Sequence, residues 1–230
     1  MFKNITVVGG SGHIGLPLSL LFTKKGYSVN IFDKNIINNN KIRKNIMPFE
    51  ELGGHNLLLN ANKKKLLNVS NKIDKLNING PIIICIGTPV DDFGNPTLDL
   101  LFNCIDELKN KINKNLLIFR STLFPGSSKL IYNYLRKNKI TNLLSFCPER
   151  VVQGQSIKEI EILPQIISAY NQSSINHSKK IFSLITKEYI ICEPEEAELI
   201  KLFTNSYRYI NFSISNQFYN ICKLSNINFN

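Results

Sequence analysis

A glycine-rich segment near the start of the chain has the composition of a phosphate-binding turn. It reads Gly10-Ser11-Gly12-His13-Ile14-Gly15, a G-x-G-x-x-G pattern between an apolar run and a helical stretch. Glycines at these positions let the backbone turn tightly and approach a pyrophosphate, which then lies at the free N–H groups of the helix N-terminus. The segment therefore predicts a dinucleotide-binding site, and a purely structural glycine turn is the alternative.

An acidic residue supplies the second part of this pattern. Asp33 stands at the end of the next apolar run, where a carboxylate accepts hydrogen bonds from the ribose hydroxyls of an adenosine. The same negative charge repels the 2′-phosphate that distinguishes NADP from NAD. We therefore predict NAD as the cofactor, bound by residues 10–15 and Asp33.

Two threonines follow later apolar runs of the chain. Thr88 and Pro89 come after the run Ile82–Ile86, and Thr122 comes after Leu116–Arg120. Open α/β sheets bind ligands at the carboxyl ends of their strands, so we expect these residues to contact the cofactor or the substrate. Turn formation around the neighbouring prolines is the alternative.

A carboxylate, a lysine and an amide complete the candidate site. Glu149 follows Pro148 at the end of another apolar run, where a partly desolvated carboxylate can act as a base or orient water. A surface ion pair with Arg150 is the alternative for Glu149. Lys201 and Asn205 are four residues apart and hence neighbours on one helix face, where together they could stabilise an oxyanion. A solvated helix face is the alternative for this pair.

Short apolar runs that alternate with longer helical stretches must position these residues. The predicted strands are Ile5–Val8, Ser28–Phe32, Ile82–Ile86, Leu116–Arg120, Leu143–Phe146, Gln165–Ser168 and Tyr189–Cys192. Several are apolar on consecutive residues, as strands covered on both faces are. The order predicts an α/β fold, a Rossmann-type doubly wound sheet that is mainly parallel.

Three helices can be placed from their patterns. The stretch Ile14–Lys25 has one apolar face and stops at Gly26. A helix is expected from Phe49 to about Asn60 within the otherwise polar, irregular interval 35–78. A long helix should run from Pro194 to Cys222, on the order of 40 Å, because its apolar residues recur at helical spacing. Such a helix exceeds one small domain and should bridge to another part.

Composition limits the classes of partner. The chain has 230 residues and a formal net charge of +11, but its lysines are scattered without an aromatic-interleaved basic stripe, so no nucleic-acid partner is predicted. No apolar run reaches the roughly 18–20 residues of a membrane span, so no membrane partner is predicted. The five cysteines form no C-x-x-C pair, which indicates reduced thiols, no metal site and a cytoplasmic location.

Further motifs extend the pattern along the chain. They are Gly87-Thr88-Pro89-Val90-Asp91 with Gly94 and Asp99, Ser121-Thr122-Leu123-Phe124-Pro125-Gly126, Cys147-Pro148-Glu149-Arg150 with Gly154, and Glu198-Leu199-Ile200-Lys201-Leu202-Phe203-Thr204-Asn205. With the glycine turn, this ordered set resembles the nucleotide-sugar dehydrogenases of the UDP-glucose/GDP-mannose dehydrogenase family. The segments Pro148–Arg150 and Leu163–Ile166 look more like its UDP-N-acetylmannosamine branch.

The resemblance implies an activity and a domain division. The family oxidises the primary alcohol of a nucleotide-linked hexose or N-acetylhexosamine to the acid in two hydride transfers. It implies catalytic roles for Thr122, Glu149, Lys201 and Asn205, and contacts to the UDP-sugar by Glu149, Arg150, Lys201 and Asn205. It also implies an NAD-binding Rossmann domain at 1–192 and the start of a central helical domain at 193–230. The expected partner is a second copy, through this helix, or a separate C-terminal half.

The sequence departs from the family pattern in two respects. The family's nucleophilic cysteine belongs to a glycine-rich motif of its second half, which is not in this chain, so we expect NAD binding with little chemistry from the chain alone. Gln153 stands where the UDP-glucose branch has a second glutamate. The alternative function is a non-catalytic dinucleotide-binding or assembly module whose long helix docks a partner.

Overall fold

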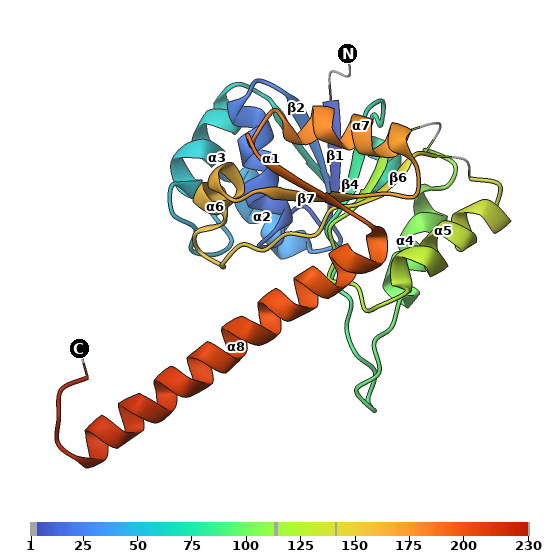
Figure 1. The fold of residues 1–230 in the computed structure, drawn as a ribbon. Helices are drawn as coiled ribbons and strands as arrows, with labels where there is room; N and C mark the ends of the chain where they lie inside the picture. Colours follow the sequence, from blue (N-terminus) through green and yellow to red (C-terminus); the bar gives the residue numbers. More distant parts are fainter. Residues whose placement is uncertain (1–3, 113–114, 141, 230) are drawn as a thin grey trace.

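The computed structural model describes residues 4–112, 115–140 and 142–229 as an α/β fold around a single eight-stranded sheet (Figure 1). The strands are β1 Asn4–Val8, β2 Ser28–Phe32, β3 Leu67–Ser70, β4 Ile82–Ile84, β5 Leu117–Phe119, β6 Leu144–Phe146, β7 Gln165–Ser168 and β8 Tyr189–Cys192. The helices are α1 Gly15–Lys24, α2 Ile36–Arg43, α3 Gly54–Lys63, α4 Asp99–Leu108, α5 Ser127–Lys137, α6 Ser156–Ile162, α7 Gln172–Phe182 and α8 Pro194–Leu224, with a 3-10 turn at Ile73–Lys75.

The strand order makes the sheet doubly wound. From one edge to the other it is β3-β2-β1-β4-β5-β6-β7-β8, and neighbours from β3 to β6 are parallel. The chain moves outward from β1 to β3 and then crosses back to β4 on the other side of β1. The point where the order reverses therefore lies between β1 and β4, at whose carboxyl ends such sheets bind ligands.

One pairing departs from the parallel arrangement. β6 and β7 are antiparallel and share the register pair Phe146 with Ser168, whereas β7 and β8 are parallel to each other. The Ser168 hydroxyl donates to the Phe146 carbonyl at 2.7 Å and strengthens this short junction. The expected mainly parallel, Rossmann-type sheet is thus confirmed, with its last two strands reversed.

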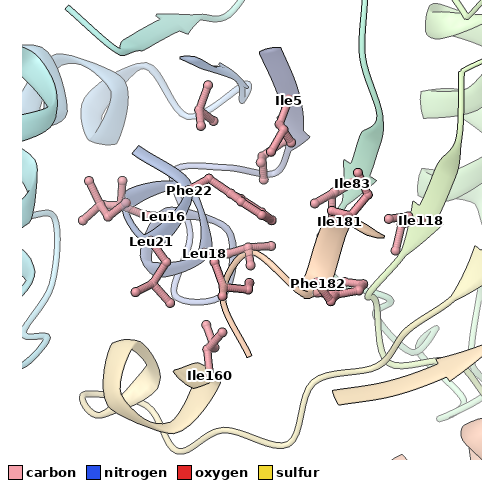
Figure 2. Packing of buried hydrophobic residues seen from close by; sticks show 14 of the residues in the cluster. Ile5, Leu16, Leu18, Leu21, Phe22, Ile83, Ile118, Ile160, Ile181 and Phe182 are labelled. Atoms are coloured by element: carbon pink, nitrogen blue, oxygen red, sulfur yellow. The ribbon is translucent and has the colours of Figure 1, made fainter. Parts of the chain in front are cut away.

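Apolar side chains cover both faces of the sheet. Ile83 belongs to a core with α1 and α7, which includes Phe22 and Phe182 (Figure 2), while the flanking Ile82 and Ile84 belong to a second core on the opposite face. Because alternate residues of a strand face opposite sides, burial on both sides requires consecutive apolar residues. This is why the strands appear in the sequence as unbroken apolar runs.

The interval 35–78 contains more regular structure than its sequence indicated. It holds α2 and the edge strand β3, neither of which was expected, and α3 begins at Gly54 rather than at Phe49. The residues before α3 are held in a non-helical conformation: Leu52 N–H donates to the Gly154 carbonyl, and Gly53 has a left-handed φ of 77°. Tertiary contacts with the segment before α6 thus override the local helical pattern.

The predicted long helix is confirmed as α8, and most of it projects away from the sheet and its covering helices. α8 has 31 residues and begins with a capping box between Glu193 and Glu196. Its buried residues all lie between Pro194 and Lys201, and the side chains from Tyr209 onward are exposed except for the half-buried Cys222. Figure 1 shows α8 projecting well beyond the sheet and its covering helices.

Glu198 attaches the base of this helix to α5. Its fully buried carboxylate accepts hydrogen bonds from the backbone N–H groups of Gly126 at 2.7 Å and Ser128 at 2.6 Å. α5 has no side-chain cap at its own N-cap residue, which is Gly126. Glu198 therefore satisfies N–H groups that helix formation leaves free, and its charge faces the positive end of α5.

Replacing Glu198 by Gln is expected to lower the free energy of unfolding by about 2–3 kcal/mol, because the buried Ser128 N–H and the half-buried Gly126 N–H would lose an anionic acceptor. Urea denaturation followed by circular dichroism measures this change. Glu188→Gln, at an exposed position, is the matched control and should change stability by less than about 0.5 kcal/mol. Equal losses in the two variants would contradict the capping role of Glu198.

Candidate functional site

The turn between β1 and α1 packs so closely that its glycines are required. A Cβ atom on Gly15 would lie 2.4 Å from the Gly9 carbonyl oxygen, and one on Gly10 would lie 2.9 Å from the Val7 carbonyl oxygen. At Gly12 the nearest atom would be 3.6 Å away, so the turn is open on that side. The predicted glycine turn is therefore present and leaves room for a ligand at its centre.

Asp33 fixes this turn to the end of β2. Its carboxylate accepts hydrogen bonds from the backbone N–H groups of Ser11 and Asn35, each at 2.9 Å. The buried hydroxyl of Ser11 has no hydrogen-bond partner. An unsatisfied polar atom in such a turn is unfavourable unless a ligand completes it, and a phosphate oxygen would do so.

A pocket of about 380 Å³ opens where the strand order reverses. It is lined by Val8, Gly9, Gly12, Phe32, Asp33, Lys34, Cys85, Ile86, Gly87, Leu100, Asn103, Cys104 and Glu107. The ends of β1 and β2, the segment after β4 and one face of α4 thus form its walls. Largely apolar walls, with the Asp33 carboxylate at the end of β2, suit the base and ribose of an adenosine, so the residues present fit a dinucleotide.

The threonines of the two later loops are brought together. The Thr88 hydroxyl donates a hydrogen bond to the Thr122 carbonyl oxygen. Pro89 is exposed, and its carbonyl accepts a hydrogen bond from Thr97 N–H at 3.1 Å. The bond between Thr88 and Thr122 joins the segments after β4 and β5 at the carboxyl edge of the sheet.

Glu149 and Lys201 form a buried ion pair at the same edge. Lys201 Nζ lies 2.6 Å from Glu149 Oε1, and the two side chains are 4% and 8% exposed. The other oxygen of Glu149 accepts a hydrogen bond from Val151 N–H at 2.7 Å. The alternative expected for Glu149, a surface pair with Arg150, is wrong, because Arg150 donates to the Pro164 carbonyl at 2.8 Å.

Lys201 and Asn205 occupy different environments although they share a helix face. Lys201 is buried, whereas Asn205 is exposed. One turn further, Arg208 donates hydrogen bonds to the Arg150 carbonyl at 2.9 Å and the Val151 carbonyl at 3.3 Å. Arg208 and Glu198 are not among the residues predicted for the site. Glu198 lies three residues before Lys201 and Arg208 three residues after Asn205, and this spacing was the available signal, since it places all four on one stripe of the helix.

His13 of the glycine turn contacts two other loops. Its ring centroid lies 3.9 Å from that of Phe49, and the Gln153 side-chain amide lies 2.9 Å from its Nδ1. Burial lowers the pKa of His13, while the carboxylate of Glu51 acts in the opposite direction. His13 therefore connects the glycine turn to Gln153 in the segment before α6.

The cysteines near this edge are poor nucleophiles. Burial raises the pKa of Cys147 to about 12, and the same cause raises that of Cys85 to about 12. Both are therefore protonated thiols at neutral pH. Among the residues that the structure describes, no three His, Cys, Asp or Glu side chains are grouped to hold a metal ion, and no helix has the length and apolar character to cross a membrane.

Replacing Lys201 by Met is expected to lower the free energy of unfolding by about 3–5 kcal/mol, because Glu149 would stay buried without its partner. The double variant Lys201→Met/Glu149→Leu should recover most of this loss. Lys24→Met is the matched control: Lys24 lies 2.7 Å from Glu161 but is 43% exposed, so its loss should stay below about 1 kcal/mol. Denaturant titration measures all three, and similar losses for the two lysines would contradict the importance of burial.

Comparison with known proteins agrees with this geometry. The profile of the UDP-glucose/GDP-mannose dehydrogenase family, NAD binding domain, matches residues 3–186. The chain is 32% identical over 235 aligned residues to a UDP-N-acetyl-D-mannosamine dehydrogenase of Methanococcus vannielii, covering 98% of this chain and 53% of that protein.

Two solved structures share the fold at comparable identity. A UDP-D-ManNAc dehydrogenase from Pyrococcus horikoshii has a TM-score of 0.86 at 25% identity, over 98% of this chain and 55% of that one. A UDP-N-acetyl-mannosamine dehydrogenase from Staphylococcus aureus has a TM-score of 0.82 at 28% identity, over 98% and 56%. The chain thus spans about half the length of the relatives it matches. On this evidence of sequence and fold, it belongs to the UDP-glucose/GDP-mannose dehydrogenase family and contains the family's NAD-binding domain.

Proposed function

We propose that the chain is the cofactor-binding part of an NAD-dependent nucleotide-sugar 6-dehydrogenase. The substrate would be a UDP-hexose or UDP-N-acetylhexosamine, oxidised at its primary alcohol to the uronate. One observation carries this proposal: the pocket beside the glycine turn and the buried Glu149–Lys201 pair lie at the carboxyl edge of one sheet. A bound dinucleotide and a sugar could therefore meet there.

The glycine-turn side of this edge would hold the cofactor. The backbone of residues 10–15 and the free hydroxyl of Ser11 would bind the pyrophosphate, and Asp33 would accept hydrogen bonds from the adenosine ribose. Thr88, Pro89 and Thr122 would contact the nicotinamide half. The nicotinamide of bound NAD supplies the hydride-accepting chemistry.

The α8 side would hold the sugar. The Lys201 ammonium, already directed at Glu149 Oε1, could donate a further hydrogen bond to an oxygen that becomes negative during reaction. Glu149 could take up a proton or orient water, and Arg150 and Asn205 would complete the substrate contacts. Because water is largely excluded from the Glu149–Lys201 pair, a small movement of a ligand oxygen would strongly change its electrostatic interaction energy with the pair.

The division of the chain follows from α8. We place the NAD-binding domain at residues 1–192 and the beginning of a helical domain at 193–230. The far part of α8 exposes Phe203, Tyr207, Tyr209, Ile210, Phe212, Ile214, Phe218, Tyr219, Ile221 and Leu224. An apolar surface of this extent favours association, with a second copy or with a separate C-terminal half. Five free cysteines agree with a reducing, cytoplasmic location.

The same exposed helix supports the second candidate, a non-catalytic dinucleotide-binding or assembly module. The two candidates differ in whether the chain binds a nucleotide sugar. Calorimetric titration with UDP-N-acetylmannosamine and UDP-glucose, in the presence of NAD, separates them. Binding that is lost in Lys201→Met/Glu149→Leu, with the fold retained, favours the dehydrogenase; NAD binding without any sugar binding favours the module.

Self-association through α8 should respond to charge on its apolar side. Phe218→Glu is expected to shift the chain toward monomer in sedimentation velocity, because burying an unpaired carboxylate in an apolar contact is unfavourable. Asn216→Glu is the control on the same helix. A chain that is monomeric before any substitution would contradict the homodimer and leave the separate half as the expected partner.

Titration with NAD and NADP tests the cofactor assignment. The chain should bind NAD more tightly than NADP, and Asp33→Asn should weaken NAD binding about tenfold, because an ionised acceptor for the ribose hydroxyls is lost. Asp92→Asn, in an exposed loop, provides the control for net charge. Absence of NAD binding, or equal affinities in the two variants, would overturn the proposed site.

A further inference from the structure

An ion pair between Lys34 and Glu107 lies at the proposed adenosine pocket. Lys34 follows Asp33 directly, on the connection between β2 and α2, and Glu107 lies in the last turn of α4. Lys34 Nζ is 2.5 Å from Glu107 Oε1, and both residues line the pocket. The pair therefore joins the segment after β2 to α4 at the pocket in which an adenosine would lie.

We propose that Glu107 determines cofactor specificity by holding Lys34 away from the ribose, so that the pocket rejects a 2′-phosphate. This inference rests on the proposed function, in which Asp33 binds the adenosine ribose. It assigns the rejection of NADP to three residues rather than to Asp33 alone.

Lys34 must be held away from the ribose if the pocket is to reject NADP, because its ammonium group would otherwise attract the 2′-phosphate. Dinucleotide sites that accept the 2′-phosphate of NADP use a basic side chain near the position of the ribose-binding acid. Lys34, next to Asp33 in the chain, is such a side chain. A lysine free to turn toward the ribose would attract the phosphate and oppose the effect of Asp33.

The charges that line the pocket disfavour the 2′-phosphate of NADP only while Lys34 is paired with Glu107. Asp33 and Glu107 contribute two negative charges and Lys34 one positive charge. A phosphate monoester carries about −1.5 to −2 at neutral pH. It would meet a net negative pocket whose single ammonium already has a carboxylate partner, whereas the uncharged ribose hydroxyl of NAD would not be affected.

A second feature places both charges near the same residue of the pocket interior. Burial raises the pKa of Cys104, which also lines the pocket, to about 12; Glu107 adds to this increase, and Lys34 opposes it. Lys34 and Glu107 therefore both act on the interior of the pocket, although their side chains are 72% and 39% exposed. Such exposure means that the pair can be opened by substitution without loss of the fold.

Calorimetric titration of the whole chain with NAD and NADP tests the proposal. Glu107→Gln should tighten NADP binding about fivefold relative to NAD, the change expected from one charge contact near solvent. Asp106→Asn is the matched control: it removes one negative charge from the adjacent position of α4, but Asp106 faces Tyr134 rather than the pocket. The double variant Glu107→Gln/Lys34→Gln should lose the gain.

The outcomes distinguish a failure of the role proposed for Glu107 from a failure of the proposed cofactor site. An NADP-to-NAD ratio that is unchanged in Glu107→Gln, or that rises as much in Asp106→Asn, overturns the role of Glu107. A gain that persists without Lys34 also overturns it, because simple repulsion by Glu107 would then suffice. If the unsubstituted chain binds neither dinucleotide, the proposed cofactor site itself fails, and the inference fails with it.

Discussion

The ion pair between Lys201 and Glu149 is the contact on which the arrangement of this protein depends. A buried ion pair contributes little net stability compared with well-packed apolar side chains, because both charges must leave water. Its effect is on position: at 2.6 Å, with the two side chains 4% and 8% exposed, it permits one register of α8 against the end of β6. Glu198, one turn earlier, fixes the same helix to the N-terminus of α5. Two buried carboxylates thus determine where a long, otherwise exposed helix begins.

This attachment connects the two halves of the candidate site. The segment after β5 links the loop after β4 to α8: its Thr122 carbonyl accepts a hydrogen bond from Thr88, and its Gly126 N–H donates one to Glu198. The glycine turn is held independently, through the bonds of Asp33 to Ser11 and Asn35. The proposed cofactor side is therefore organised by backbone geometry, and the proposed substrate side by the buried charges of Glu149 and of Lys201 on α8.

The sequence predicted those parts of the fold that local patterns determine. The seven expected strands lie within two residues of their predicted bounds. Six of them are largely buried, and burial on both faces requires continuous apolar runs, whereas β8 is an apolar run at an exposed edge. The edge strand β3 was missed because Leu67–Ser70 alternates with polar residues and is only partly buried. The start of α3 was misplaced because contacts of Leu52 and Glu51 with the segment 154–157, remote in sequence, hold the preceding residues outside the helix.

The sequence predicted the parts of the candidate site in which a motif specifies backbone geometry. It did not predict which side chains form ion pairs across elements that are distant in sequence. The glycine turn, Asp33, Glu149 and Lys201 all lie at the expected edge, but the partner of Glu149 is Lys201, which is distant in sequence, and not the adjacent Arg150. The bond from Lys34 to Glu107 crosses between elements in the same way.

The most direct test of the whole account is a crystal structure of the chain with NAD. We predict the pyrophosphate on the glycine turn, the adenosine ribose at Asp33 and the nicotinamide directed toward Glu149 and Lys201; a dinucleotide bound elsewhere, or with its nicotinamide directed away from this pair, would contradict it.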